Sequence, residues 1–116
     1  MDDLRQQHCV SIKGGEPVLT VSEIEQFQEQ APGWNVQEVN GEKQLQKAYQ
    51  FPNFSTALAF TDQIGQLADQ ENHHPALLTE WGKVTVSWWT HKIKGLHRND
   101  LIMAAKTDQA YSTKRV

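Results

Sequence analysis

The dipeptide Asn40-Gly41 constrains the fold of this chain more than any other feature of the sequence. Both residues readily adopt the positive φ that a two-residue hairpin turn requires. Apolar and polar side chains alternate over residues 34–39 before the dipeptide and 42–51 after it. Because this period of two is typical of strands, the pattern predicts one antiparallel β-hairpin.

A second hairpin is predicted around Gly82, between alternating segments at residues 77–81 and 83–91. If Gly82-Lys83 are the central turn residues, with glycine first as in a type II′ turn, this register sets His74 opposite His91. A slip by one residue would reverse the faces of the strand. The same alternation divides the second strand into one face with Val84, Val86 and Trp88 and another with Thr85, Ser87, Trp89 and His91.

Helices are predicted before, between and after the two hairpins. Thr20 and Glu23 have the spacing of a capping box, and Pro32-Gly33 ends the helix that follows. Asn53 is the expected N-cap of an amphipathic helix from residue 54 to about residue 72. The last helix begins after Gly95-Leu96, capped by Asn99 or a neighbour.

This order of elements, α-β-β-α-β-β-α, predicts an α+β fold. The economical packing is a four-stranded antiparallel sheet with three helices on one face. We interpret residues 1–116 as a single domain, in which residues 1–19 form an N-terminal arm without periodicity. A symmetric dimer that continues the sheet would protect its edges and its uncovered face.

Composition excludes several classes of function. A net charge of −3 without a basic stripe argues against nucleic-acid binding, and no apolar run is long enough to span a membrane. The acidic N-terminus has no apolar segment typical of a secretory signal, and Cys9 is the only cysteine. These features predict a cytoplasmic protein without disulfides.

Three of the five histidines lie in two short segments, His73-His74-Pro75 and Thr90-His91, which the second hairpin brings together. Asp69 precedes His73 by four residues, so the two side chains should be stacked if the last helical turn is intact. The residue before a proline is extended, so His74 should point elsewhere. Since the ordinary pKa of histidine is about 6.5, such a cluster is suited to acid and base catalysis near neutral pH.

Each of these residues also has a simpler interpretation. A histidine at a helix end often serves only as a partner of the helix dipole, and Asp100 could be only a charge in the first turn of the last helix. Zinc is the rival use of three histidines, but adjacent histidines rarely converge on one metal ion, so we predict no metal site. Trp88 shares the parity of the core valines, whereas Trp89 shares the parity of His91 and is the better candidate to line a site.

The sequence resembles the pterin-4a-carbinolamine dehydratase family, whose members are also known as dimerisation cofactors of a hepatocyte transcription factor. The resemblance runs from about Leu19 into the last helix. The motifs that carry it are Pro-Gly-Trp at 32–34, Phe51 and Phe54, Asp69, Asn72-His73-His74-Pro75, Thr90-His91, Gly95-Leu96 and Asp100. The segments 77–83, 88–91 and 95–100 look like the bacterial branch associated with phenylalanine hydroxylation. The chain departs from the family at Ala76-Leu77 and at His97.

The resemblance implies a set of site residues. His73, His74 and His91 would be catalytic, with Asp69 and Asp100 in supporting positions. The pterin would be bound by residues of two segments: His73, His74 and Pro75, and Thr90, His91, Lys92 and Ile93. To these the strand parity described above adds Trp89. Pterin is then the substrate, and no cofactor is expected.

The implied reaction dehydrates 4a-hydroxytetrahydrobiopterin to quinonoid dihydropterin, which recycles the cofactor of an aromatic amino-acid hydroxylase. We assign His74 as the base, His91 as the acid and His73, held by Asp69, as the group that orients the ring. The opposite assignment of acid and base stays open, because the sequence does not fix the face from which the hydroxyl leaves. The resemblance also implies a homodimer or homotetramer and transient contact with phenylalanine hydroxylase. The alternative is a non-enzymatic dimerising partner of a hydroxylase or a transcription regulator.

Overall fold

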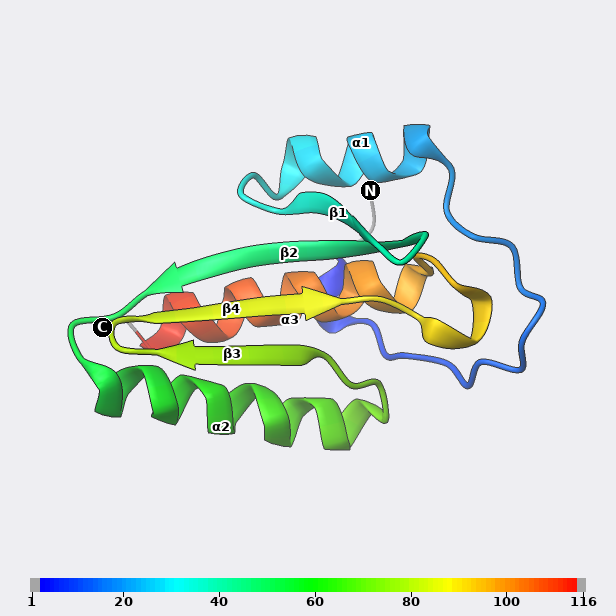
Figure 1. Cartoon of the computed structure of the whole chain (residues 1–116). Helices are drawn as coiled ribbons and strands as arrows, with labels where there is room; N and C mark the ends of the chain where they lie inside the picture. The colour runs from blue at the N-terminus through cyan, green and yellow to red at the C-terminus, as the bar shows by residue number, and fades with distance from the viewer. Residues whose placement is uncertain (1–2, 115–116) are drawn as a thin grey trace.

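The computed structural model describes residues 3–114, without the side chains of residues 113 and 114. Its elements follow the predicted α+β order, preceded by one short 3-10 helix and interrupted by another (Figure 1). They are η1 (Leu4–Gln6), α1 (Val21–Gln30), β1 (Asn35–Val39), β2 (Glu42–Gln50), α2 (Phe54–Glu71), β3 (Ala76–Glu80), β4 (Lys83–Trp88), η2 (His91–Ile93) and α3 (Arg98–Lys114).

The four strands form one antiparallel sheet in the order β1-β2-β4-β3. Side chains that alternate along β2 and β4, including Leu45, Tyr49, Val84 and Val86, are buried on one face beneath the helices. In Figure 1, α3 crosses behind the sheet, while α1 and α2 lie along its two edges. Trp88 is fully buried on this face, and its Nε1–H donates to Thr107 Oγ1 of α3 at 3.1 Å.

The first half of the fold agrees closely with the local sequence signals. Thr20 and Glu23 form the reciprocal capping box of α1, and the Asn53 side chain accepts from the Thr56 N–H at the start of α2. Asn40 and Gly41 have φ values of 53° and 81°, as a type I′ turn requires. The prediction of the first hairpin is therefore confirmed.

The predicted register of the second hairpin is wrong by two residues. Glu80 pairs with Lys83, so the turn residues are Trp81 and Gly82 rather than Gly82 and Lys83. Trp81 keeps a negative φ and Gly82 has a φ of 77°, the pattern of a type II turn, in which glycine comes second. A shift of two preserves the faces, so Val84, Val86 and Trp88 still lie in the core. Extended past the strands, the observed register would place Trp89 rather than His91 opposite His74.

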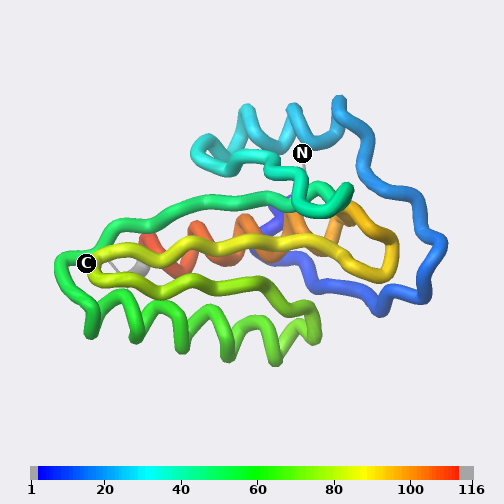
Figure 2. Tube along the Cα trace, viewed as in Figure 1, coloured from blue at the N-terminus to red at the C-terminus, as the bar shows by residue number. Residues whose placement is uncertain are grey.

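The N-terminal arm lies against the body of the protein (Figure 2). From η1 the chain passes the start of α3 and then the loop that follows β4, before it reaches α1. Leu4 anchors the beginning of the arm in the core. Within residues 3–114, no helix has both the length and the hydropathy needed to cross a membrane.

Candidate active site

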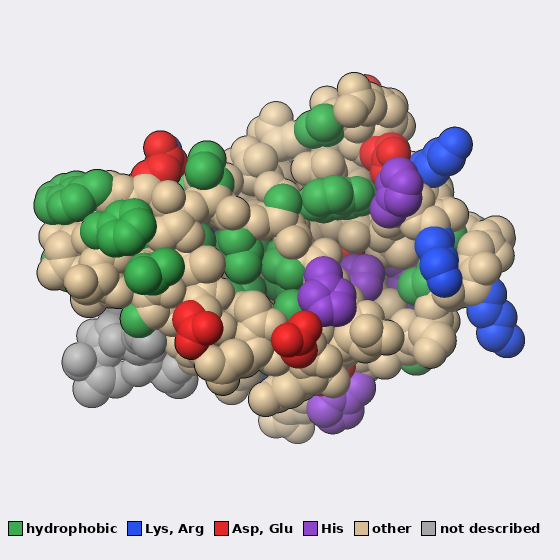
Figure 3. All heavy atoms as spheres, turned by 60° about the horizontal axis from the view of Figure 1, so that its bottom comes forward, with side chains coloured by type: hydrophobic (Ala, Val, Ile, Leu, Met, Phe, Trp, Pro, Cys, Tyr) green, Lys and Arg blue, Asp and Glu red, His purple; other side chains and the backbone are tan. Residues whose placement is uncertain are grey.

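All three histidines singled out in the sequence line one cavity of about 410 Å³. Figure 3 shows histidine side chains gathered on one half of the surface in view, while exposed hydrophobic side chains gather at the other end. The cavity is lined by Val10, Ser11, Ile12, Asn72, His73, His74, Trp89, Thr90, His91 and Lys92. Pro75 and Ile93 are not among these lining residues. A larger cavity of about 740 Å³ between η1, α1 and α3 has no histidine in its wall.

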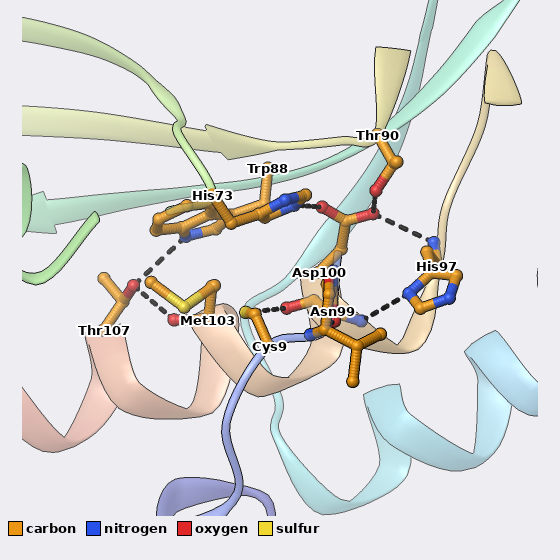
Figure 4. A network of polar contacts seen from close by, with 10 residues as sticks. Cys9, His73, Trp88, Thr90, His97, Asn99, Asp100, Met103 and Thr107 are labelled. Atoms are coloured by element: carbon orange, nitrogen blue, oxygen red, sulfur yellow. Dashed lines mark hydrogen bonds and ion pairs between the residues drawn. The ribbon is translucent and has the colours of Figure 1, made fainter. Parts of the chain in front are cut away.

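His73 is the most buried of the three, and its partner is Asp100. Its Nε2 lies 2.7 Å from Asp100 Oδ1, with side-chain exposures of 10% for His73 and 0% for Asp100. Because an ionised carboxylate only accepts hydrogen bonds, Nε2 of His73 carries the hydrogen in this pair. The imidazole also lies parallel to the Trp88 ring, with an interplanar angle of 9° and 6.0 Å between centroids (Figure 4). His73 is therefore held in one orientation.

Asp100 is fully satisfied although it is buried. Its Oδ2 accepts from Thr90 Oγ1 at 2.7 Å and from the His97 N–H at 2.9 Å. His97 Nδ1 in turn accepts from the Asn99 N–H at 3.0 Å, so His97 fills the N-cap position that a hydroxyl residue usually takes. Asp100 thus both caps α3 and supports His73, which joins the two interpretations offered by the sequence.

The prediction that Asp69 stacks on His73 is wrong. α2 ends at Glu71, and Asn72 takes the left-handed conformation with φ 53° and ψ 41°. This turn rotates His73 out of the helical register and brings His74 to Asp69 instead, with 2.9 Å between Nε2 and Oδ1. The pair of His74 and Asp69 is open to solvent, with side-chain exposures of 57% and 82%.

His91 has a carboxylate partner that the sequence did not reveal. Its Nδ1 lies 3.1 Å from Glu42 Oε1, although 49 residues separate the two. Leu45 pairs with Trp88 between β2 and β4, and the same register carried to the ends of the strands aligns Glu42 with His91. Only knowledge that β2 neighbours β4 could have identified Glu42 in advance.

Each histidine therefore has one ring nitrogen paired with a carboxylate: His73 with Asp100, His74 with Asp69 and His91 with Glu42. The other nitrogen lies outside that pair, as proton transfer to or from a bound molecule requires. Within the described part of the chain, no group of three or more His, Cys, Asp or Glu side chains has an arrangement that would hold a metal ion.

Cys9 adds no nucleophile to this region. Burial, together with the nearby Glu71 and Asp100 carboxylates, raises the pKa of its thiol to about 12. Its Sγ–H instead donates to the Asn99 carbonyl oxygen at 3.8 Å. Since the thiolate is the reactive form, this thiol is inert near neutral pH.

Comparison with known proteins finds relatives that match most of the chain. Residues 17–110 match the family model described as pterin 4 alpha carbinolamine dehydratase. A protein of Microcystis aeruginosa, provisionally named as a pterin-4-alpha-carbinolamine dehydratase, is 54% identical over 111 residues, which cover 96% of each chain. A protein of Syntrophotalea carbinolica with the same provisional name is 54% identical over 108 residues, or 93% of this chain and 96% of the relative.

Two solved structures share the fold. A transcriptional coactivator/pterin dehydratase from Brucella melitensis superposes with a TM-score of 0.72 at 30% identity, covering 82% of this chain and 99% of that one. A pterin dehydratase-like protein described as a RuBisCO assembly factor in the alpha-carboxysome gives a TM-score of 0.59 at 20% identity, covering 70% and 92%. The second likeness concerns the fold alone.

Proposed function

The chain belongs to the pterin 4 alpha carbinolamine dehydratase family, and from that membership we propose that it dehydrates 4a-hydroxytetrahydrobiopterin to quinonoid dihydropterin and water. The observation that carries the proposal is the convergence of His73, His74 and His91 on one cavity, each with its own carboxylate. This hydro-lyase reaction would recycle the cofactor of an aromatic amino-acid hydroxylase.

The reaction needs one base and one acid. The base removes the proton from N5, and the electron pair of the N5–H bond forms the double bond between N5 and C4a. The C4a–O bond breaks at the same time, and the acid protonates the departing hydroxyl to give water. The step is not a redox reaction, so we propose that the protein needs no resident cofactor or metal and that the pterin is its substrate.

We assign His74 as the base and His91 as the acid. Both are exposed to the cavity and keep one ring nitrogen outside their carboxylate pair. His73 would orient the pterin ring, because Asp100 and Trp88 hold it in place. Asp100, not Asp69, is therefore the carboxylate that supports the orienting histidine.

Single-turnover measurement of quinonoid dihydropterin formation from synthetic carbinolamine tests these roles. His91→Ala and His74→Ala should each lower the rate about 10²- to 10⁴-fold, the usual contribution of a general acid or base. His8→Ala is a matched control. His8 has the same side-chain exposure as His91, 78%, and also contacts a glutamate, but lies outside the cavity wall. Wild-type rates in both site variants would refute the assignment.

A binding role is the second candidate, supported by a separate surface. Phe54, Leu58, Leu78 and Trp81 are large apolar side chains with exposures between 44% and 74%. Exposed apolar groups of this kind are typical of protein contacts. We propose that they serve contact with further copies of the chain, as a dimer or tetramer, or with a hydroxylase such as phenylalanine hydroxylase in the cytoplasm. Light scattering and a pull-down with a purified pterin-dependent hydroxylase distinguish the two.

A further inference from the structure

Three consecutive residues of the N-terminal arm form part of the cavity wall. Val10, Ser11 and Ile12 line the same 410 Å³ space as the three histidines. They lie before residue 17, where the match to the family model begins. This part of the wall is therefore a feature of the chain that the family match does not describe.

The arm is fastened to the elements that carry the site. The Cys9 N–H donates to Glu71 Oε1 at 2.8 Å, just before the histidine pair. Asn99, which is 1% exposed and precedes Asp100, forms two hydrogen bonds with the Val10 backbone, of 3.0 and 2.8 Å.

The third tie comes from the residue after His91. Lys92 Nζ donates to the Ile12 carbonyl oxygen at 3.1 Å. In Figure 4, Cys9 and Asn99 lie directly beside Asp100, on the side of the network that receives the arm. Residues 10–12 are thus held at both ends, at Val10 and at Ile12, as a surface that selects among substrates must be.

We infer that Val10, Ser11 and Ile12 recognise the substituent at C6 of the pterin, an inference that depends on the dehydratase function proposed above. C6 is bonded to N5, the atom that loses its proton, so a substituent at C6 lies next to the histidines. The arm provides two branched apolar side chains on either side of a hydroxyl. This combination suits a short hydroxylated alkyl chain.

The arm residues should affect selectivity and not the chemical step. None of the three carries a titratable side chain, so none can serve as acid or base. Contacts with a part of the substrate that does not react are the same in the ground state and the transition state, and their loss raises KM with little change in kcat.

The test compares two carbinolamines that differ only at C6, one with a methyl group and one with a 1,2-dihydroxypropyl group. Ser11→Ala and Val10→Ala should each lower the preference for the larger substituent, measured as the ratio of kcat/KM values, about three- to tenfold through KM. The controls are Ser22→Ala and Val21→Ala at the start of α1. Val10 and Val21 are 61% and 58% exposed, and both serines are exposed, so all four variants should fold.

An unchanged ratio in both arm variants, or an equal loss of kcat with both substrates, would overturn the inference. Failure of the wild type to convert either substrate would instead refute the dehydratase function. In that case, quenching of pterin fluorescence still tests the arm. Biopterin and 6-methylpterin carry the same two substituents, and their Kd ratio should shift in Ser11→Ala but not in Ser22→Ala.

Discussion

At the scale of single residues, the site is built from pairs of an imidazole and a carboxylate that differ in burial. Asp100 is inaccessible and accepts three hydrogen bonds, whereas Asp69 is largely in water. Glu42 lies between these extremes, with an exposure of 16% beneath an exposed His91. His73, to which we assign the orientation of the pterin, thus has the most buried partner.

Glu42 should contribute to activity through His91. Glu42→Ala removes the carboxylate that accepts from Nδ1 of His91, so the imidazole is free to rotate. The rate of dehydration should therefore fall on the order of tenfold, as is found for groups that orient histidines at metal sites. Glu42→Gln keeps an acceptor oxygen and should recover part of the loss. Glu38→Ala removes an exposed carboxylate from the neighbouring strand as a control. Equal rates in Glu42→Ala and Glu38→Ala would contradict the pairing.

At the scale of elements, the β3–β4 turn sets the register on which the site depends. The type II turn needs a positive φ at its second residue, and Gly82 provides it. A Cβ on Gly82 would also lie 3.2 Å from the Phe51 carbonyl oxygen. Both features make this glycine a requirement of the hairpin.

Two glycine substitutions should therefore act in opposite directions. Gly82→Ala should lower the free energy of unfolding by about 1–2 kcal/mol, because an alanine there is forced into the left-handed region. Gly65→Ala, within α2 and with no atom within 4 Å of the added Cβ, should raise it by about 0.5–1 kcal/mol. Urea denaturation of both variants measures the difference. A stabilising Gly82→Ala would show that the turn has another conformation.

At the scale of the whole molecule, Glu71 connects the arm to the body. Burial by itself would raise the pKa of Glu71, but hydrogen bonds from the Cys9 N–H and His8, with Lys106 nearby, outweigh it and hold the pKa below its ordinary value of 4.5. A lowered pKa in the folded state stabilises the protein above pH 4.5, and the contribution is lost as pH falls through the folded-state pKa.

The variant Glu71→Gln should show this dependence on pH. At pH 7 its free energy of unfolding should be about 1 kcal/mol lower than that of the wild type, as expected for the loss of charge from a hydrogen-bonded pair. The difference should shrink as pH falls below 4.5 and should vanish once pH has passed the lower pKa of the folded-state carboxylate. Thermal unfolding between pH 3 and pH 7 measures it. A difference that is constant across this range would indicate that the charge of Glu71 is irrelevant.

Most of the fold could be predicted from the sequence, because its signals are local. The capping box at Thr20, the turn at Asn40-Gly41 and the cap at Asn53 each act within four residues. The prediction put the second turn one residue too late. Gly82-Lys83 fits a type II′ turn, in which glycine comes first, whereas the chain forms a type II turn with Gly82 second. A single left-handed residue, Asn72, was enough to bring Asp69 to His74 rather than to His73.

The site was less predictable, since its remaining parts are joined across long distances in the sequence. The pairing of Glu42 with His91 exists only because β2 neighbours β4, and no local pattern encodes that order. The arm has no periodicity at all, and its position is set by side chains far along the chain. The three histidines could be grouped from their spacing, whereas the walls and supports around them could not.

The fastening of the arm has a consequence for how the protein matures as it is made. Residues 9, 10 and 12 are anchored by residues 62, 89 and 80 positions later, so the arm cannot be fastened until those later residues have been made. Closing such long loops is slow compared with forming hairpins and helices. We expect the sheet and α2 to assemble first, and the cavity to gain its final wall only after the start of α3 has been made.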